Sequence, residues 1–434
     1  MKTKPEKHRV NIVTLGCSKN QIDSEKLMKQ FEANGLQVVH NDNSTNADSV
    51  FINTCGFIKD AKEESIDTIL QFARAKEKGD IKNLYVIGCL SERYKADLEK
   101  EITEVNRFFG TNNIQEIIAG IGYNYKEHLA GERILTNPSH YAYIKISEGC
   151  DRHCSFCAIP LMRGKYKSRT VQEILTEAQN LANSGVKELM LIAQDLSYYG
   201  VDLYKKQVLS ELLIQLADID KLEWIRLHYA YPAGFPKNVL NVMQQNTNVC
   251  NYLDIPFQHI SNPVLKKMRR GITRQQTYDL IQHIRDTVPD ITLRTTLMVG
   301  HPGEGQGEFE ELQEFVERVR FNRLGVFTYS EEEDTYGSRN FPDSIPAKIK
   351  QERAEKIMNR QREISGDLNR KMIGKHIRIL VDRQEEDYYV GRTEGDSPEV
   401  DNEVIIHSKT RLIPGSFYHG AVISAGDYDL VAVI

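Results

Sequence analysis

The most restrictive feature of this chain is a group of three cysteines, Cys150, Cys154 and Cys157, within the segment KISEGCDRHCSFCAIP. Three thiolates at this spacing suit an iron-sulfur cluster that leaves one iron without a protein ligand. Structural zinc sites and clusters used only for electron transfer have four protein ligands. We therefore expect an iron-sulfur centre whose vacant iron can bind a reactive cofactor, with zinc as the weaker alternative.

A second group of cysteines follows three short apolar runs. Cys17, Cys55 and Cys89 each come directly after, or one turn beyond, the runs VNIVTLG, SVFINT and LYVIG. These runs indicate buried parallel strands, and ligands collect at the carboxyl ends of such strands. Any one of these cysteines alone would more often be a small buried apolar residue. The threefold repetition favours a second cluster, whereas we expect Cys250, in NVCNYLDIP before a strand, to be a core or free thiol.

Composition indicates an ordinary globular protein of several domains. The chain has 434 residues, of which 40% are hydrophobic and 27% are charged. The first residues, MKTKPEKHRV, lead into a strand, and no window approaches eighteen uninterrupted apolar residues. We expect no membrane segment and no secretion. Reduced cysteines grouped as ligands are typical of a reducing compartment, so the expected location is the cytoplasm.

Charge argues against a surface built to bind nucleic acid. The net charge is −5, and residues 371–434 hold seven Lys or Arg against eleven Asp or Glu, a net charge of −4. A domain that grips RNA needs basic side chains to neutralise phosphates. We therefore expect this terminal region to repel RNA and to attract a basic protein.

The pattern of apolar runs predicts an α/β protein with four regions, 1–135, 136–345, 346–369 and 370–434. The first alternates strands and helices, with helices expected at 24–31 and 59–72, and predicts a flavodoxin-like three-layer domain. The second predicts a partial βα barrel with strands in AYIKIS, ELMLIAQ, EWIRLH, YLDIP, ITLRTTLM and RLGVFT. The third predicts a connecting helix. The fourth predicts a small β-barrel with strands in HIRILVD, YYVGRT, EVIIH and AVISAG.

Several motifs make the chain resemble a known family along its whole length. They are LGCSKN, NTCGF, IGCLSER and GCDRHCSFCAIPLMRGKYKSR. They resemble the radical S-adenosylmethionine methylthiotransferases, which end in a TRAM domain. The resemblance implies two 4Fe-4S clusters, an auxiliary one on Cys17, Cys55 and Cys89, and a catalytic one on Cys150, Cys154 and Cys157. It also implies that the open iron of the catalytic cluster chelates the methionine part of S-adenosylmethionine.

The resemblance implies that sulfur and a methyl group are inserted at an unactivated C–H bond by radical chemistry. Acid-base chemistry at neutral pH does not remove so weakly acidic a proton. We expect Phe156 in the cysteine loop, Gln194 after the second barrel strand, and Gly300 in LMVGHPGEG to bind the cofactor. A glycine at position 300 would let the backbone approach the adenosyl part closely.

Local features indicate which branch of the family the chain resembles. The segments SEGCDRHCSFC, LIAQDLSYYG and GRTEGDSPEVDNEV resemble the branch that modifies an aspartate β-carbon of small-subunit ribosomal protein twelve. Glu331 to Glu333 stand where the transfer-RNA enzymes usually carry Arg-Pro. The implied partners are this basic ribosomal protein, free or within the ribosome, and a reductant protein. Modification of a transfer-RNA adenosine is the alternative activity, and a non-catalytic iron-sulfur electron carrier is the alternative of another class.

Some features leave their role open. The basic runs at 163–169 and 266–271 suit either solvated surface or contacts to cofactor or substrate. None of the four histidines near strand ends or cysteines is expected to be a ligand: His153, His228, His259 and His301. The chain also departs from the family pattern, with Thr170 in place of the usual proline and His301 in place of an aromatic residue.

Overall fold

The computed structural model describes residues 8–42, 47–111, 113–129 and 131–434. Their contacts divide the chain into two units. Unit 1 is Met1–Thr136, Glu148–Asp151 and Ala158–Tyr166, and unit 2 is Asn137–Ser147, Arg152–Cys157 and Lys167–Ile434. The chain therefore passes between units within the cysteine loop, which the division into four regions did not anticipate. That four-region division itself stays a prediction.

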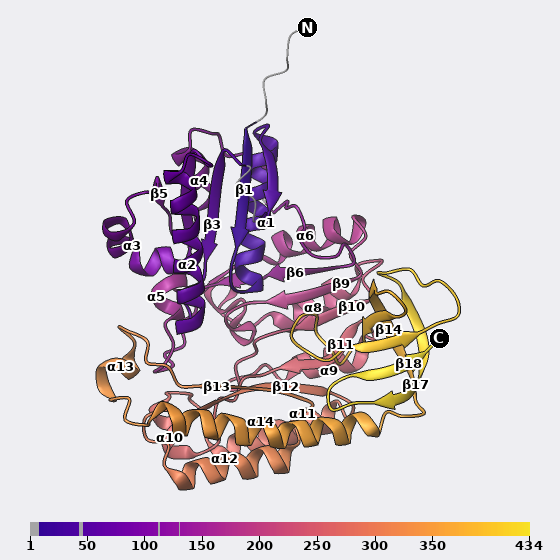
Figure 1. The fold of residues 1–434 in the computed structure, drawn as a ribbon. Helices are drawn as coiled ribbons and strands as arrows, with labels where there is room; N and C mark the ends of the chain where they lie inside the picture. Colours follow the sequence, from indigo (N-terminus) through magenta and orange to yellow (C-terminus); the bar gives the residue numbers. More distant parts are fainter. Residues whose placement is uncertain (1–7, 43–46, 112, 130) are drawn as a thin grey trace. The chain divides into compact units, whose positions relative to one another are not determined.

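Unit 1 contains a five-stranded sheet in which all strands are parallel (Figure 1). The strand order is β2-β1-β3-β4-β5, which is the flavodoxin-like order. The central strand pairs in register with both neighbours, so that Phe51 lies opposite Ile12 on one side and Tyr85 on the other. The strands are β1 (Arg9–Thr14), β2 (Gln37–His40), β3 (Ser49–Thr54), β4 (Asn83–Gly88) and β5 (Arg107–Phe108).

Helices cover both faces of this sheet because successive residues of β3 point to opposite sides. Val50 and Ile52 pack in a core with Phe72, whereas Phe51 packs in a separate core with Phe31. These two cores confirm the expected three layers. The helices of unit 1 are α1 (Ser18–Ala33), α2 (Lys59–Glu77), α3 (Cys89–Glu101), α4 (Ile114–Gly120), η1 (Glu127–Leu129) and α5 (Ile159–Arg163). Helices α1 and α2 are both longer than the sequence pattern predicted.

Unit 2 contains a six-stranded parallel sheet in the order β13-β12-β11-β10-β9-β6. All six predicted barrel strands are present. They are β6 (Tyr141–Lys145), β9 (Glu188–Ile192), β10 (Trp224–Leu227), β11 (Val249–Asp254), β12 (Thr292–Val299) and β13 (Arg323–Thr328). Cys250 lies inside β11 rather than before it, and it is fully buried beside Trp224 and Tyr252.

Short strands and helices lie between the barrel strands, and α13 follows the last of them. They are β7 (Ser147–Glu148), β8 (Lys167–Ser168), α6 (Val171–Asn183), η2 (Leu196–Tyr198), α7 (Val201–Tyr204), α8 (Leu209–Ala217), α9 (Asn238–Gln245), α10 (Asn262–Lys267), α11 (Arg274–Thr287), α12 (Gln306–Val319) and α13 (Tyr336–Asn340). Helix α6 begins with a capping box, because Thr170 Oγ1 accepts from Glu173 N and Thr170 N donates to Glu173 Oε2. The departure from the family pattern at Thr170 therefore serves as a helix cap.

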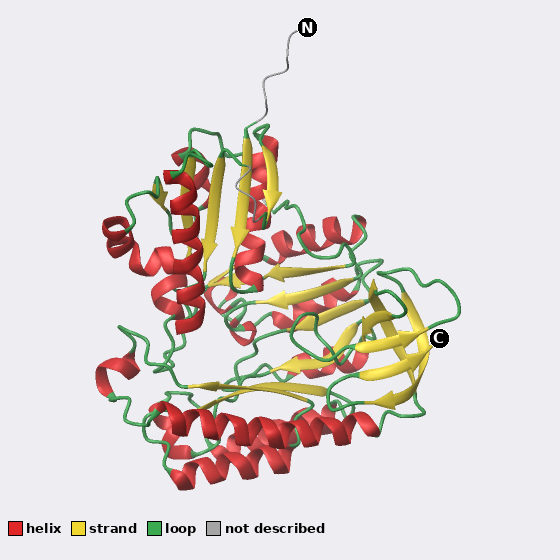
Figure 2. Cartoon of the chain, in the orientation of Figure 1, coloured by secondary structure: helices red, strands yellow, loops and turns green. Residues whose placement is uncertain are grey.

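The C-terminal part of unit 2 consists of the long helix α14 (Ala347–Arg370) and a closed five-stranded barrel (Figure 2). The barrel closes in the order β14-β15-β16-β18-β17 around Ile379, Val381, Val404 and Ile406. The short last strand β18 was missed from the sequence. The strands are β14 (His376–Gln384), β15 (Tyr389–Arg392), β16 (Val404–His407), β17 (Phe417–Ala425) and β18 (Leu430–Val433).

Buried charges join the C-terminal barrel to the strands of the parallel sheet. Glu188 is fully buried at the start of β9, where Arg226 Nε and Arg392 Nη2 each lie 2.8 Å from one of its carboxylate oxygens. Burial alone would raise the pKa of Glu188, but the two guanidinium groups outweigh it and hold the pKa below its ordinary value. Arg392 also binds Asp382, which accepts from His140 at 2.8 Å.

Acidic side chains of the loop between β15 and β16 form ion pairs and hydrogen bonds within the protein. Asp396 pairs with Arg323, Asp401 lies 3.2 Å from Arg294, and Glu399 accepts from the hydroxyl groups of two tyrosines of β6. The net charge of residues 371–434 is therefore a poor measure of what this barrel presents to a partner. The expectation that this region repels RNA stays a prediction, and Asp396 and Asp401 contribute little to it because Arg323 and Arg294 neutralise them.

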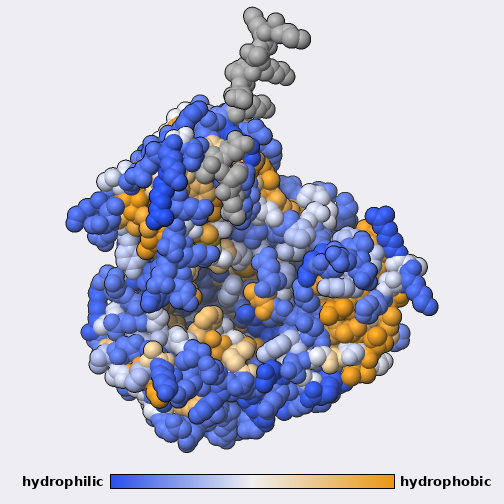
Figure 3. Space-filling model, viewed as in Figure 1, coloured by the Kyte–Doolittle hydropathy of each residue, from blue (hydrophilic) through white to orange (hydrophobic). Residues whose placement is uncertain are grey.

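The outer surface of the C-terminal barrel is partly apolar. Ile413, Ile423 and Val433 are 63%, 53% and 40% exposed, and Figure 3 shows apolar side chains gathered over this part of the chain. Exposed apolar groups of this kind suit contact with a protein more than contact with phosphates. Within the part of the chain that the structure describes, none of the helices combines the length and apolarity needed to cross a bilayer.

Candidate functional site

Cys17, Cys55 and Cys89 lie at the carboxyl ends of three neighbouring strands of unit 1. Cys17 follows β1 and precedes the first residue of α1, Cys55 follows β3, and Cys89 follows β4 as the first residue of α3. Because β1 and β4 both pair with β3, the three strand ends are adjacent. The parallel pairing thus brings together three cysteines that are 38 and 34 residues apart in the sequence.

Tight backbone packing shows how close these cysteines come. A Cβ added at Gly16 would lie 2.8 Å from Cys55 Cβ and 3.0 Å from Cys55 Sγ. One added at Gly56 would lie 3.0 Å from the carbonyl carbon of Cys89. Gly16 also has φ near +92°, a conformation that glycine adopts most easily. The glycines beside the cysteines therefore allow the loops that carry them to pack closely together.

Polar side chains hold the loops that carry these cysteines. Asn20 Nδ2 donates to Leu15 O at 2.8 Å and to Thr54 O at 3.0 Å, and so joins the ends of β1 and β3. Cys55 N donates to Ser65 Oγ at 3.0 Å, and that hydroxyl in turn donates to Cys55 O. These hydrogen bonds fix the backbone at Cys55 and in the loop before Cys17.

The thiols differ in how readily they ionise. Burial raises the pKa of Cys55 to about 11 and also raises that of Cys89. Loss of solvation would raise the pKa of Cys17 as well. Lys19, Arg163 and backbone N–H groups at the start of α1 outweigh this effect, and the pKa of Cys17 is lowered. Positive charge therefore lies where thiolate ligands would need it.

Among the described residues, no three His, Cys, Asp or Glu side chains converge closely enough to hold a single metal ion. A four-iron cluster spaces its ligands more widely, because each thiolate binds a different iron. Cys17, Cys55 and Cys89 are free thiols, and the loops that carry them pack too closely for further side chains at Gly16 and Gly56. This arrangement fits such a cluster better than a single ion.

The cysteine loop belongs partly to each unit. In unit 1, Cys150 N donates to Gly164 O at 3.1 Å. In unit 2, Cys157 N donates to Cys154 O at 3.2 Å, which forms a tight turn. Both bonds fix the backbone around the thiols, as a ligand loop requires.

Cys154 has a basic neighbour that sequence reasoning left open. Arg270, from the run at 266–271, is buried and lies with Nη1 3.3 Å from Cys154 Sγ. Tyr231 positions it, since the tyrosine hydroxyl donates to Arg270 O at 2.6 Å and the ring faces the guanidinium. A cation held at this distance stabilises a thiolate. This basic residue is therefore part of the site rather than solvated surface.

The three residues expected to bind the cofactor all lie in unit 2. Phe156 is half-buried in the cysteine loop with its ring 6.4 Å from the ring of His301, and Gln194 is half-buried just after β9. Gly300 follows β12 with φ near +77°, and a Cβ there would collide with the side chain of Lys350. The need for glycine at this position is thus explained by Lys350, and the cofactor contacts of all three residues stay predictions.

The histidines near strand ends are held by hydrogen bonds within the protein. His228 bonds Ser397 at 2.9 Å, His259 accepts from Ser261 N at 3.0 Å, and His301 bonds Ser155 at 3.2 Å. Burial lowers the pKa of His301 to about 4, so it is neutral at physiological pH and packs against Tyr329 as an aromatic ring would. This explains how His301 replaces the usual aromatic residue.

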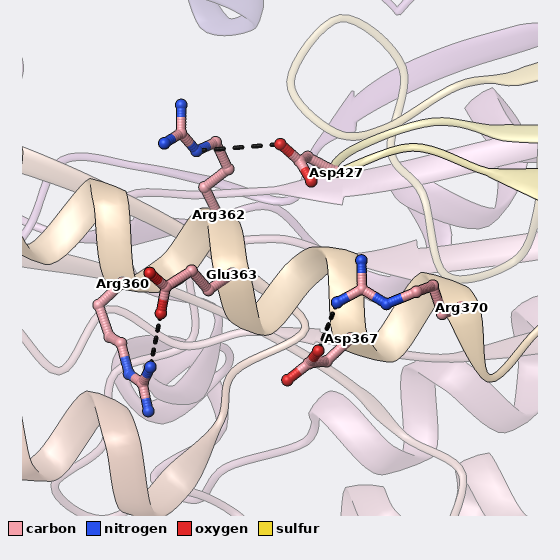
Figure 4. Close-up of a pocket in the computed structure, with 6 residues that line it drawn as sticks. All are labelled: Arg360, Arg362, Glu363, Asp367, Arg370 and Asp427. Atoms are coloured by element: carbon pink, nitrogen blue, oxygen red, sulfur yellow. Dashed lines mark hydrogen bonds and ion pairs between the residues drawn. The ribbon is translucent and has the colours of Figure 1, made fainter.

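A surface hollow lies where α14 meets the turn between β17 and β18 (Figure 4). Its side chains pair with one another: Arg360 with Glu363, Arg370 with Asp367, and Arg362 with Asp427. It contains no cysteine and no residue expected to bind a cofactor. The hollow is therefore a surface of paired charges and is not the candidate functional site.

Comparisons with known families divide the chain into three matched segments. Residues 9–110 match the family described as Uncharacterized protein family UPF0004, residues 144–316 match the Radical SAM superfamily, and residues 373–434 match the TRAM domain. The second match supports a 4Fe-4S cluster and S-adenosylmethionine as cofactors. These matches agree with the expected order of a flavodoxin-like domain, a radical barrel and a terminal β-barrel.

Curated relatives match the chain over nearly its full length. Ribosomal protein uS12 methylthiotransferase RimO of Phocaeicola vulgatus is 53% identical over 430 residues, which cover 99% of this chain and all of the relative. The chain belongs to the RimO family. The RimO proteins of Parabacteroides distasonis (98% of each chain) and Flavobacterium psychrophilum (99% of each chain) are 53% and 51% identical to it. The expected family and its protein-modifying branch are confirmed.

Solved structures resemble the fold. TsrM from Kitasatospora setae, a radical S-adenosylmethionine methyltransferase solved with cobalamin and a [4Fe-4S] cluster, matches with a TM-score of 0.54. The match covers 76% of this chain and 77% of that one at 13% identity. The radical enzyme OxsB, solved with aqua-cobalamin and S-adenosylmethionine, gives a TM-score of 0.53 at 13% identity, covering 83% of this chain and 56% of that one. At this identity the likeness concerns the fold alone.

Proposed function

We propose that this chain adds a methylthio group to the β-carbon of an aspartate in the small-subunit ribosomal protein uS12. The main support for this proposal is the 53% sequence identity to RimO proteins over nearly the whole chain. The placement of Cys17, Cys55 and Cys89 at three adjacent strand ends supports a sulfur-donating centre held by unit 1.

In this proposal Cys150, Cys154 and Cys157 hold the catalytic 4Fe-4S cluster, and Cys17, Cys55 and Cys89 hold an auxiliary one. When bound, the clusters and S-adenosylmethionine supply the electron, the radical, the sulfur and the methyl group. The protein's own groups prepare the sites. Arg270 Nη1 donates to Cys154 Sγ at 3.3 Å, and Lys19, Arg163 and the start of α1 lower the pKa of Cys17. Phe156, Gln194 and Gly300 bind S-adenosylmethionine.

The partner is a basic ribosomal protein, free or assembled in the ribosome, together with a protein that supplies electrons. The exposed apolar residues of the C-terminal barrel and its exposed acidic residues Glu386 and Asp387 support a protein partner over RNA. Such a partner places the enzyme in the cytoplasm. The described helices, none of which is suited to a membrane, agree with this location.

The test is a competition between the candidate substrates. Anaerobically reconstituted enzyme is incubated with dithionite, S-adenosylmethionine, uS12 and transfer RNA together, and each product is analysed by mass spectrometry. We expect a methylthio increment on an aspartate of uS12 and unmodified adenosines in the RNA, because both clusters serve one protein substrate. The variant with Cys17, Cys55 and Cys89 replaced by alanine is the control, and it should leave uS12 unmodified.

Two results would contradict this function. A methylthio group found only on transfer-RNA adenosine would identify an RNA-modifying enzyme. Bound iron without any release of deoxyadenosine would identify a non-catalytic electron carrier.

A further inference from the structure

Arg163 is a buried cation whose surroundings the proposed chemistry does not yet explain. It ends helix α5 in unit 1, and its side chain is 4% exposed. Nε lies 3.2 Å from Cys89 Sγ, Nη1 lies 2.8 Å from Asp23, and Nη2 donates to Asn20. All of these residues belong to unit 1. One edge of the guanidinium therefore binds carboxylate and amide oxygens, and Nε binds the sulfur of a candidate cluster ligand.

Two carboxylates fix the orientation of the Arg163 guanidinium relative to Cys89 Sγ. Asp23 on α1 and Glu148 beside the cysteine loop both lie within ion-pair distance of Nη1, at 2.8 and 3.4 Å. Helix α5 is anchored by apolar contacts, since Ala158 and Met162 pack with Cys89 in a small buried cluster. Arginine suits such a position because its planar fork binds several acceptors in a fixed geometry. Nε thus donates to one acceptor, Cys89 Sγ.

The residue after Arg163 contacts the other cysteine set. Gly164 O accepts a hydrogen bond from Cys150 N at 3.1 Å, and both residues belong to unit 1. Two consecutive residues therefore bind Cys89 through a side chain and Cys150 through the backbone. Arg163 and Gly164 therefore connect an auxiliary cysteine to the catalytic loop within unit 1.

We propose that Arg163 is a positioning residue that fixes the Cys89 ligand relative to Cys150 and raises the reduction potential of the auxiliary cluster. This inference rests on the proposed function, since it requires a cluster on Cys17, Cys55 and Cys89. Hydrogen bonds and positive charge at a ligand sulfur favour the more negative, reduced state of an iron-sulfur cluster. An arginine that only filled space would leave the potential unchanged.

The experiment uses the full chain with Cys150, Cys154 and Cys157 replaced by alanine, so that only the auxiliary cluster is observed. Redox titration followed by electron paramagnetic resonance compares Arg163, Arg163→Lys and Arg163→Met in this background. We expect the midpoint potential to fall in Arg163→Met, and to fall less in Arg163→Lys, which keeps the charge but loses the Nε donor. Arg107→Met is the matched control, because Arg107 pairs with Glu116 at an exposed site of the same unit.

Iron content and folding separate the possible failures. Equal midpoint potentials in all three proteins would overturn the role of Arg163 while leaving the auxiliary cluster intact. Absence of iron from the background protein with Arg163 present would overturn the auxiliary cluster itself, and with it this inference. Loss of iron from Arg163→Met alone, with unchanged circular dichroism, supports positioning. If Arg163→Met does not fold, the potential of Arg163→Lys decides.

Discussion

Replacement of Cys150, Cys154 and Cys157 by alanine is expected to abolish deoxyadenosine release and uS12 modification. The expected loss is at least about 10⁶-fold, the lower end of enzymatic accelerations, because no other group in the chain opens a radical route. The measurement is deoxyadenosine formed from S-adenosylmethionine and dithionite by anaerobically reconstituted protein. Circular dichroism should be unchanged, since these loop residues are only partly buried.

Cys250→Ala is the matched control for this prediction. Cys250 is the one cysteine outside both sets, and it is fully buried in β11 among apolar side chains. Its removal should leave iron content and deoxyadenosine release close to wild type. Deoxyadenosine release that survives in the triple variant, or disappears in Cys250→Ala, would contradict the assignment of the catalytic ligands.

The second large effect concerns stability rather than chemistry. Glu188→Gln is expected to lower the free energy of unfolding by about 3–5 kcal/mol, the usual cost of removing one partner from a buried ion pair. Glu188 is fully buried between Arg226 and Arg392, so its loss leaves two guanidinium groups without their shared carboxylate. Denaturant unfolding followed by circular dichroism measures the change.

The control is Glu403→Gln. Glu403 pairs with Arg383 at the surface, with both side chains more than 40% exposed, and such pairs contribute at most about 1 kcal/mol. We expect a clear difference between the two substitutions. Similar small losses for both variants would show that the Glu188 network does not hold the C-terminal barrel against the parallel strands.

Much of the fold was predictable because parallel strands leave strong local patterns. Fully buried strands such as SVFINT and ELMLI contain short apolar runs, and every predicted barrel strand is present. The cysteines at three strand ends were recognisable for the same reason. The strands β2 and β18 were missed, although the equally short strands β10, β15 and β16 were predicted.

Contacts between distant segments were not predictable from local pattern. Arg163 and Arg270 belong to basic runs that look like solvated surface, yet both are buried beside cysteine sulfurs. The acidic loop after β15 also differs from what its sequence suggests. Asp396 and Asp401 read as surface charge, but arginines more than 70 residues away neutralise them. Charge counts along a sequence do not reveal which charges face inward.

Iron and sulfide analysis of the reconstituted protein is the most direct test of two clusters on six cysteines. Wild-type chain should hold about eight iron atoms, and each alanine triple variant, of Cys17, Cys55 and Cys89 or of Cys150, Cys154 and Cys157, should hold about four. A wild-type content of about four that persists when Cys17, Cys55 and Cys89 are replaced would show that the N-terminal cysteines hold no cluster.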